Sequence, residues 1–243
     1  MAVPRKAFLD ANVLRGQLTT DTLLSLANAR LFEPHWSEQV LEEVRRNRPA
    51  GVLESSIDSR FAQMNKIFPA AMTSGYEPLM PQMRADEKDK HVLAAAVQSG
   101  ADVLVTENVK DFDPPTSGQY AMPVERTSAF LNRLLEENQD QVVEAMNKMV
   151  ARNRREPTTT PELVDKMATQ QDLKGFAHKL NEAVPPEQRG SHPSLAVGKA
   201  TKTSASIALD GIALAKGSAV KPVTTAEARQ SKQKTDQTPN REL

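Results

Sequence analysis

The stretch Lys-Ala-Phe-Leu-Asp-Ala-Asn-Val-Leu (residues 6–14) joins a short apolar run to a single carboxylate, that of Asp10. A bounded apolar run of this length predicts a buried strand over residues 6–9. Asp10 then stands at the carboxyl end of that strand, where open parallel sheets bind their ligands. The stretch therefore predicts one strand of a sheet and places an acid at its ligand-binding edge.

Strand-like and helical segments alternate along the chain on both sides of this pattern. Apolar spacing predicts helices over about 18–30, 37–47, 53–67 and 87–99. It predicts further strands over 31–34, where Pro34 is expected to end the strand, over about 70–73 and over 102–106. Residues 119–124 could form an edge strand, and a closing helix follows over 128–137. This alternation predicts an α/β fold, a three-layer α/β/α domain with a central parallel sheet.

The chain divides into three predicted parts. Residues 1–136 hold the sheet domain, and residues 137–185 form a helical C-terminal extension. The extension contains a helix over about 138–153, a helix begun by Thr160 as N-cap with Pro161 in its first turn, and a short helix ending near Leu180. Residues 186–243 are rich in Ser, Thr, Lys and Ala, with nine Lys/Arg against five Asp/Glu, and predict a disordered basic low-complexity tail.

Composition excludes several kinds of chemistry. The 243 residues include no cysteine, which excludes disulfides, thiolate catalysis and zinc–cysteine sites. The four histidines show no metal-ligand spacing, and a net charge of +0 does not indicate a globally basic nucleic-acid binder. The sequence shows neither a signal peptide nor a spanning segment, so we expect a soluble cytoplasmic protein without a membrane partner.

Acidic residues recur beside the predicted apolar segments. The four that share this placement are Asp10, Glu43, Asp89 and Asp111. Carboxylates brought together from distant parts of a chain repel one another, so such a cluster needs cations to offset its charge. The pattern therefore predicts a divalent-metal site, and chemistry on a substrate as anionic as a phosphodiester.

Helical phase selects among neighbouring acids. In residues 36–47, Glu43 flanks the apolar face, whereas Glu42 points away from it. In residues 87–99, Asp89 falls near the centre of the apolar face and His91 falls on the opposite side. Because a buried carboxylate costs free energy unless it is paired or metal-bound, this phase favours Glu43 and Asp89 as site residues.

Each acid also has a structural interpretation when it is taken alone. Asp89 could serve the helix dipole, with Asp86 as the N-cap of the same helix. Asp111 could begin the turn that follows it, and Asp10 could belong to a strand-to-helix turn. The order of the four acids and their flanking residues, taken together, favour a common site.

Four motifs resemble those of PIN-domain nucleases, most closely the VapC-like toxins of type II toxin–antitoxin systems. They are Phe-Leu-Asp-Ala-Asn-Val-Leu (8–14), Ser-Glu-Gln-Val-Leu-Glu-Glu-Val-Arg (37–45), Asp-Lys-His-Val-Leu-Ala-Ala-Ala (89–96) and Val-Leu-Val-Thr-Glu-Asn-Val-Lys-Asp-Phe (103–112). The resemblance covers about residues 6–135 and implies a PIN-like fold for this part of the chain. Each motif alone is weak, but their order and spacing together are specific.

The resemblance also implies which residues form the site. The implied catalytic residues are Asp10, Glu43, Asp89 and Asp111, and the implied metal ligands are Asp10, Asp89 and Asp111. The last family acid normally follows the threonine by two positions, where this chain has Asn108, so Asp111 is the expected substitute. Asn12, Thr106 and Asn108 are implied as supporting residues. The departure at Asn108 leaves open whether one or two ions bind.

The resemblance implies an endoribonuclease that depends on Mg²⁺ or Mn²⁺ and leaves 5′-phosphate and 3′-hydroxyl ends. Carboxylates suit such hard cations, and single-stranded RNA loops are the implied substrates. An antitoxin protein is implied as the inhibiting partner, and a homodimer is a further expectation. Arg45, Arg46 and Arg48 could contact RNA phosphates, or could form a solvated helix end favoured by the helix dipole.

Other functions stay open. The main rival is a weak or inactive PIN-like module that binds RNA or a protein partner, which Asn108 suggests. A DNA nuclease of the same architecture is disfavoured because the long helical-arch insertions of flap nucleases are absent. Gly198-Lys199 has no glycine five positions before it, so the sequence contains no phosphate-binding loop there. The helices of 138–184 could extend the core, mediate dimerisation or bind an antitoxin.

Overall fold

A computed structural model describes residues 5–114 and 120–196. Five parallel strands form its sheet, in the order β3-β2-β1-β4-β5. Their bounds are Arg5–Leu9 (β1), Phe32–Ser37 (β2), Met72–Thr73 (β3), Val103–Val105 (β4) and Val124–Glu125 (β5). The predicted parallel sheet is therefore confirmed, with the strand that precedes Asp10 at its centre. From residue 197 onward, the tail predicted to be disordered lies outside the described residues.

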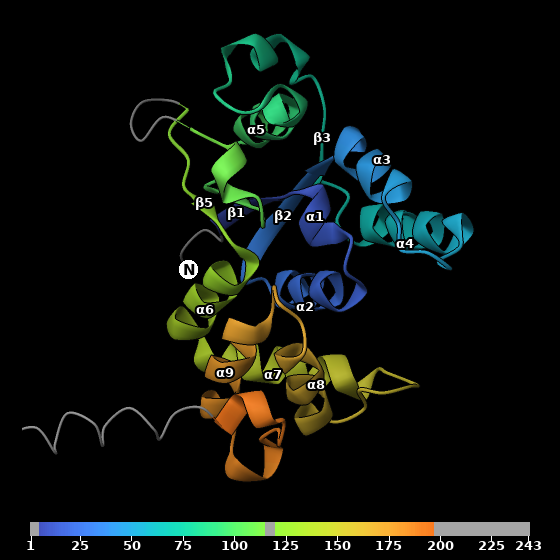
Figure 1. Cartoon of the computed structure of the whole chain (residues 1–243), viewed down its shortest axis with the longest axis vertical. Helices are drawn as coiled ribbons and strands as arrows, with labels where there is room; N and C mark the ends of the chain where they lie inside the picture. The colour runs from blue at the N-terminus through green and yellow to red at the C-terminus, as the bar shows by residue number, and fades with distance from the viewer. Residues whose placement is uncertain (1–4, 115–119, 197–243) are drawn as a thin grey trace, which may run out of the picture. The chain divides into compact units, whose positions relative to one another are not determined.

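Helices cover both faces of the sheet, which confirms the predicted α/β/α layers. Figure 1 shows Lys90–Gln98 (α5) on one side of the strands, and Gln17–Asn28 (α2) and Thr127–Glu137 (α6) on the other. The short helix Ala11–Leu14 (α1) follows β1 directly, and Glu38–Arg46 (α3) packs against it. Glu54–Ile67 (α4) in turn packs against α3.

The central strand is short but buried on both faces. Ala7, Phe8 and Leu9 are all fully buried, as expected for an apolar run with no polar alternation. Phe32 on the neighbouring strand β2 meets Phe130 of α6 edge-on, with ring centroids 5.0 Å apart. The core therefore joins the sheet to its flanking helices through large side chains.

Strand β2 continues beyond Pro34 to Ser37, so the prediction that this proline ends the strand is wrong. The N–H of Trp36 donates to the carbonyl of Ala71 (3.0 Å), on the side of the strand that faces β3. Pro34 lies two residues earlier and faces the same side, at a level where β3 has not yet begun. Because no neighbour needs a donor there, the missing N–H leaves the ladder intact.

Three further helices pack beside the sheet domain: Gln139–Ala151 (α7), Thr160–Ala168 (α8) and Lys174–Ala183 (α9). Helix α7 packs on α2, and α9 packs on both α6 and α8. The N-cap of α8 is Thr159 rather than the predicted Thr160, since its hydroxyl accepts from the N–H of Glu162 (3.4 Å). Thr19 of α2 donates to Asp172, between α8 and α9 (2.5 Å). Within the described ranges, no helix has the length and apolar character needed to cross a membrane.

We predict that Phe176→Ala, in α9, lowers the free energy of unfolding by about 3–5 kcal/mol, because Phe176 is fully buried. If the sheet and the C-terminal helices unfold together, the transition reported by Trp36 in β2, the single tryptophan of the chain, moves with it. Fluorescence during urea denaturation measures this midpoint. Lys174→Ala, at an exposed site of the same helix, serves as the control. An unchanged Trp36 midpoint in the Phe176 variant would show that the helices unfold separately.

Candidate metal centre

Two neighbouring strands bring the site together at the carboxyl edge of the sheet. Leu9 pairs with Val105, and the N–H of Asp10 donates to the carbonyl of Val105 (3.1 Å). Asp10 therefore follows β1 at the same level as Thr106 follows β4. The strand order reverses between β1 and β4, and at such a switch point an open parallel sheet leaves a crevice for ligands.

Asp10 is buried, with 6% of its surface exposed, and both of its carboxylate oxygens accept hydrogen bonds. Oδ1 accepts from the backbone N–H of Ala11 (2.6 Å) and so caps helix α1. Oδ2 accepts from the Thr106 hydroxyl and from the Asn12 amide, both at 2.7 Å. These contacts fix the carboxylate in one orientation at the end of β1.

The three predicted supporting residues form a network beside Asp10. Asn12 Nδ2 also donates to Thr106 Oγ1 (3.0 Å), and Asn12 Oδ1 accepts from the backbone N–H of Glu107 (3.0 Å). Thr106 Oγ1 also accepts from the N–H of Asn108 (3.1 Å). The amide and the hydroxyl therefore tie the loop after β4 to the loop after β1.

Burial raises the pKa of Asp10 from 3.8 to about 6, and the charges of Glu43 and Asp89 add to this rise. The hydrogen bonds from Thr106 and Ala11 act in the opposite direction, because they stabilise the charged form. Desolvation is the largest of these effects. The site thus holds a carboxylate whose charge the surrounding residues only partly offset.

Asp89 ends the 3-10 helix Glu87–Asp89 (η2), directly before α5 begins. Its side chain is 17% exposed, and Oδ2 is buried without a hydrogen-bond partner among the described residues. Burial is the main cause of its raised pKa, which Asp111, Glu43 and Asp86 raise further and Lys88 lowers. A buried carboxylate oxygen without a donor is suited to bind a cation.

Asp111 lies beside Asp89, and a third acid, Asp86, joins them. Asp111 ends the 3-10 helix Val109–Asp111 (η3), whose backbone carbonyl at Asp111 accepts from the N–H of Asp86 (3.0 Å). Oxygens of Asp86, Asp89 and Asp111 all lie within 4.8 Å of one another. Lys88 Nζ lies 3.7 Å from Asp89 Oδ2 and 3.8 Å from Asp111 Oδ2. The sequence interprets Asp86 as a helix cap, and its three-residue spacing from Asp89 is the signal that points to a shared cluster.

Glu43 reaches the site from α3. Val40 and Val44 bury the inner face of this helix, and Ser37 caps its start by accepting from the N–H of Val40 (3.3 Å). Glu43 Oε1 lies 2.9 Å from Nε2 of His91, which is 1% exposed. The prediction placed His91 on the side of the helix opposite its apolar face, and that side is buried as well.

The reason lies in the composition of α5. Its residues His91 to Ala96 are all buried, so the side of the helix opposite its apolar face is also covered. A helix with apolar or small side chains on most of its faces is expected to be buried on all sides. The three consecutive alanines of α5 are the feature of the sequence that indicates this. His91 thus became a site neighbour that helical phase alone did not identify.

A cleft of about 300 Å³ unites most of these groups. Its lining residues are Asp10, Ala11, Asn12, Arg15, Glu43, Val44, Arg46, Asn47, Lys88, Asp89 and Asn108. Asp111 lies near Asp89 but is not among the lining residues, whereas Asn108 is. The structure therefore brings Asp10, Glu43 and Asp89 to one cavity, with Asp111 adjacent.

The three predicted arginines separate into two groups. Arg46 lines the cleft, together with Arg15, which the sequence interpretation did not single out. Arg45 pairs with Glu42 and donates through Nε to Asp58 of α4 (2.9 Å). Arg48 pairs with Glu54 of α4 (3.6 Å). Arg45, in α3, and Arg48, just after it, therefore connect this part of the chain with α4.

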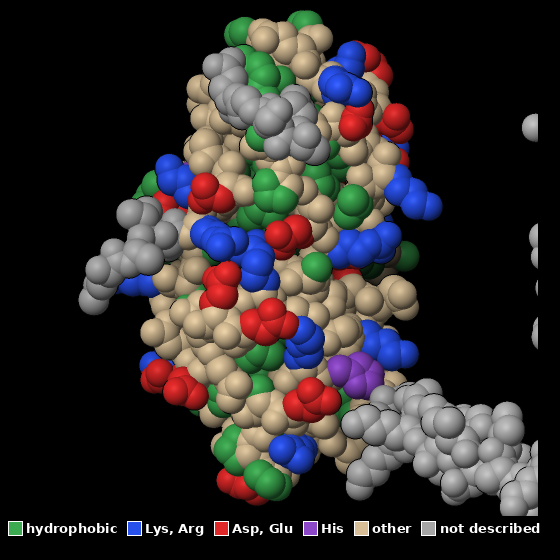
Figure 2. Space-filling model, turned by 90° about the vertical axis from the view of Figure 1, so that its left-hand side faces the viewer, with side chains coloured by type: hydrophobic (Ala, Val, Ile, Leu, Met, Phe, Trp, Pro, Cys, Tyr) green, Lys and Arg blue, Asp and Glu red, His purple; other side chains and the backbone are tan. Residues whose placement is uncertain are grey.

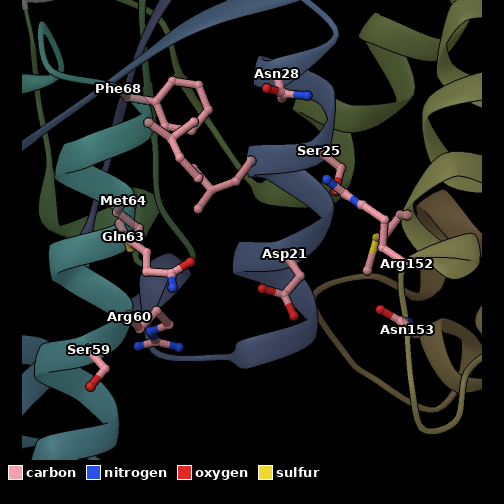
Figure 3. A pocket seen from close by; sticks show the side chains of 13 residues that line it. Asp21, Ser25, Asn28, Ser59, Arg60, Gln63, Met64, Phe68, Arg152 and Asn153 are labelled. Atoms are coloured by element: carbon pink, nitrogen blue, oxygen red, sulfur yellow. The ribbon is translucent and has the colours of Figure 1, made fainter.

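A larger cavity of about 490 Å³ lies between α2, α4 and α7. Figure 3 shows Arg60 of α4 and Asp21 of α2 on facing walls, with Arg152 beside Ser25 on the side of α7. Burial raises the pKa of Asp21 and lowers that of Arg60, and each charge partly offsets the effect on the other. Asp21 is the single carboxylate among the described residues that line this cavity. The carboxylate set that suits a divalent ion is therefore that of the first cleft.

The residues of that cleft fit a hard divalent cation. They offer carboxylate oxygens, one of them buried without a donor, and amide oxygens at the edge of the sheet. Burial raises the pKa of both Asp10 and Asp89, and neighbouring carboxylates raise both further. A bound cation would lower both values.

Comparison with known proteins agrees with this geometry. A family model for the PIN domain matches residues 6–110, and one for the VapC50 C-terminal domain matches residues 128–182. The protein "Putative ribonuclease VapC50" from Mycobacterium tuberculosis is 31% identical over 115 residues, which cover 47% of this chain and 67% of that protein. No solved structure matches significantly. The chain belongs to the PIN-domain family, among its VapC-like toxins.

Proposed function

We propose that this protein is a Mg²⁺-dependent endoribonuclease that hydrolyses phosphodiester bonds of RNA in the acidic cleft. The observation that supports this most strongly is the buried Asp10 carboxylate, held in one orientation in a cleft that Glu43 of α3 and Asp89, directly before α5, also line. Burial raises its pKa to about 6, and the charges of Glu43 and Asp89 raise it further. The nuclease activity rests on family membership, and the assignment of roles rests on the geometry.

Asp10, Asp89 and Asp111 would hold Mg²⁺, or Mn²⁺ in its place. When bound, such an ion supplies a water of lowered pKa and offsets negative charge on the phosphate. Asp10 has its orientation fixed by Thr106 and Asn12, so it would enter the coordination shell without reorganisation. Asn108 lines the cleft with a neutral amide, which reduces the charge available for a second ion.

Glu43 would accept the proton of the attacking water. One oxygen, Oε1, contacts His91, which leaves Oε2 free to take a proton from a water in the cleft. The water oxygen bonds to phosphorus as the bond from phosphorus to the ribose 3′ oxygen breaks. The products are then a 5′-phosphate and a 3′-hydroxyl.

Two arginines at the cleft would bind the RNA backbone. Arg15 and Arg46 line the cavity, and each could contact phosphate oxygens on either side of the scissile bond. Lys88 also lines the cavity, but its Nζ lies 3.7 Å from Asp89 Oδ2 and 3.8 Å from Asp111 Oδ2. Arg46 is favoured over Arg45 and Arg48, which pair with acids of α4. On the face shown in Figure 2, basic and acidic side chains are interspersed. Binding is therefore proposed to depend on these local cations and on an exposed single strand.

Family membership also supports an antitoxin as the partner that holds the nuclease inactive. A rival function, an inactive module that binds RNA or protein, is favoured by one observation, the amide of Asn108 in the cleft. The two functions differ in a measurable way. A nuclease requires a divalent cation and Asp10 for product formation, whereas a binding module retains RNA in chelator.

We predict that Asp10→Asn lowers RNA cleavage in Mg²⁺ by more than about 100-fold. The expected loss is large because even partners of metal ligands cost roughly 10–100-fold when they are replaced. Product formation from a labelled single-stranded RNA is measured with Mg²⁺ and with chelator. Asp21→Asn makes the same chemical change in the larger cavity and should retain cleavage. Cleavage in chelator, or a fully active Asp10 variant, would contradict the proposed mechanism.

A second prediction concerns stability and pH in the absence of metal. The pKa of Asp10 is raised on folding from 3.8 to about 6, so the folded chain holds this proton more tightly than the unfolded chain does. Ionisation of Asp10 therefore costs nothing below about pH 4, and a full penalty on the order of 3 kcal/mol above about pH 6. Urea denaturation in chelator should show that raising the pH from 4 to 7 destabilises the wild type more than Asp10→Asn.

Mg²⁺ provides the second arm of this experiment. At pH 7 it should raise the unfolding midpoint of the wild type, because it binds the folded chain and offsets the buried charge. The Asp10→Asn variant should show a much smaller rise, and Asp21→Asn a rise equal to that of the wild type. Equal responses of wild type and Asp10→Asn to pH and to Mg²⁺ would place the cation elsewhere.

A further inference from the structure

His91 connects the two helices that supply acids to the cleft. It is the second residue of α5, two positions after Asp89, and its ring is almost fully buried. Its Nε2 lies 2.9 Å from Oε1 of Glu43 on α3. Asp89 and Glu43 both line the cleft, so this one contact joins the two segments that carry them.

The chemistry of the two partners defines the direction of the hydrogen bond between His91 and Glu43. Nδ1 of His91 is buried and has no hydrogen-bond partner among the described residues. A carboxylate can only accept, so Nε2 must carry the hydrogen and donate it to Glu43. With the hydrogen on Nε2, a bare Nδ1 needs no acceptor.

The contact restricts a side chain that otherwise has few constraints. Glu43 has three rotatable bonds, and its side chain is 26% exposed. The described residues give its carboxylate one hydrogen bond from a side chain, that from His91. Asp10, by contrast, is held by Ala11, Asn12 and Thr106. The direction of the Glu43 carboxylate therefore depends on the imidazole.

We propose that His91 is a positioning residue that orients Glu43 within the cleft through its Nε2–H. The inference rests on the proposed function, because it assigns Glu43 to the reaction. His91 contacts neither RNA nor the cation in this role. It selects which oxygen of Glu43 is occupied and which one remains free.

Two amide substitutions separate this role from simple core packing. Gln at position 91 places its amide near the position of Nε2, whereas Asn places its amide near that of Nδ1. His91→Gln should therefore keep kcat within about threefold of wild type. His91→Asn and the apolar His91→Leu should lower kcat roughly 10–100-fold, with a smaller change in KM. Rescue by Gln but not by Asn is the outcome that packing alone does not produce.

A second readout does not depend on cleavage. Glu43 is not a proposed ligand, but its charge acts on Asp10, so its position affects the attraction of the cleft for a cation. Calorimetric titration of Mg²⁺ into the full chain without RNA should therefore give the same order, with wild type and His91→Gln binding more tightly than His91→Asn and His91→Leu. If the wild type does not cleave RNA, the proposed nuclease function fails, but this order still tests the orientation of Glu43. Equal affinities and equal kcat values in all four proteins would overturn the inference.

A third measurement covers the case in which the variants fold poorly. ¹⁵N NMR of the histidine rings in the wild type should show His91 with its hydrogen on Nε2 and a bare Nδ1. The His91 signal is assigned as the one that remains when each of the other three histidines, His35, His178 and His192, is replaced by Gln in turn. A hydrogen on Nδ1 and none on Nε2 would overturn the inference, since Glu43 would then receive no hydrogen bond.

Discussion

The hydrogen bond from the Thr106 hydroxyl to Asp10 joins the ends of two parallel strands, and the site depends on it. Leu9 and Val105 pair in register, so the residues that follow them emerge at one point on the sheet edge. This is where the strand order reverses, and flanking helices therefore diverge and leave a crevice. The pairing of β1 with β4 is thus sufficient to place the buried Asp10 carboxylate in the cleft, whereas the other acids come from other segments.

Burial of that carboxylate sets the electrostatics of the cleft. Asp10 loses water on folding and regains hydrogen bonds from Thr106 and Asn12, yet its pKa still rises to about 6. Further negative charge on Glu43 and Asp89 raises it more. Such an arrangement reduces stability without a cation and favours cation binding, because the same charges that repel one another attract the ion. Burial of Asp10 among other carboxylates therefore lowers the stability of the metal-free fold and also supports the proposed cation binding.

Apolar periodicity predicted the sheet and its layers because a parallel sheet buried on both faces needs continuous apolar runs. Predictions from apolar periodicity are wrong where contacts between distant segments decide strand length or burial. Pro34 stays within β2 because no strand faces it, which depends on where β3 begins. His91 is buried because neighbouring elements cover α5 on all sides, and helical phase describes one helix alone. Asp10 is predictable because it directly follows an apolar run, and Glu43 and Asp89 are predictable because helical phase places them beside or within an apolar face. Asp86 was missed as a site neighbour because it follows a loop.

The C-terminal helices pack against helices on one face of the sheet, and one of these, α2, lies just after the short helix that Asp10 caps. Helix α7 packs on α2 and α9 packs on α6, on the face of the sheet opposite α5, whereas α3 and α5 supply Glu43 and Asp89. Helix α2 follows α1 directly, and α1 begins at its cap, Asp10. A shift of α2 against α7 would therefore reach Asp10 through one short helix. Their connection to the reaction, on this geometry, is the rigidity they give to the segment that orients the first acid.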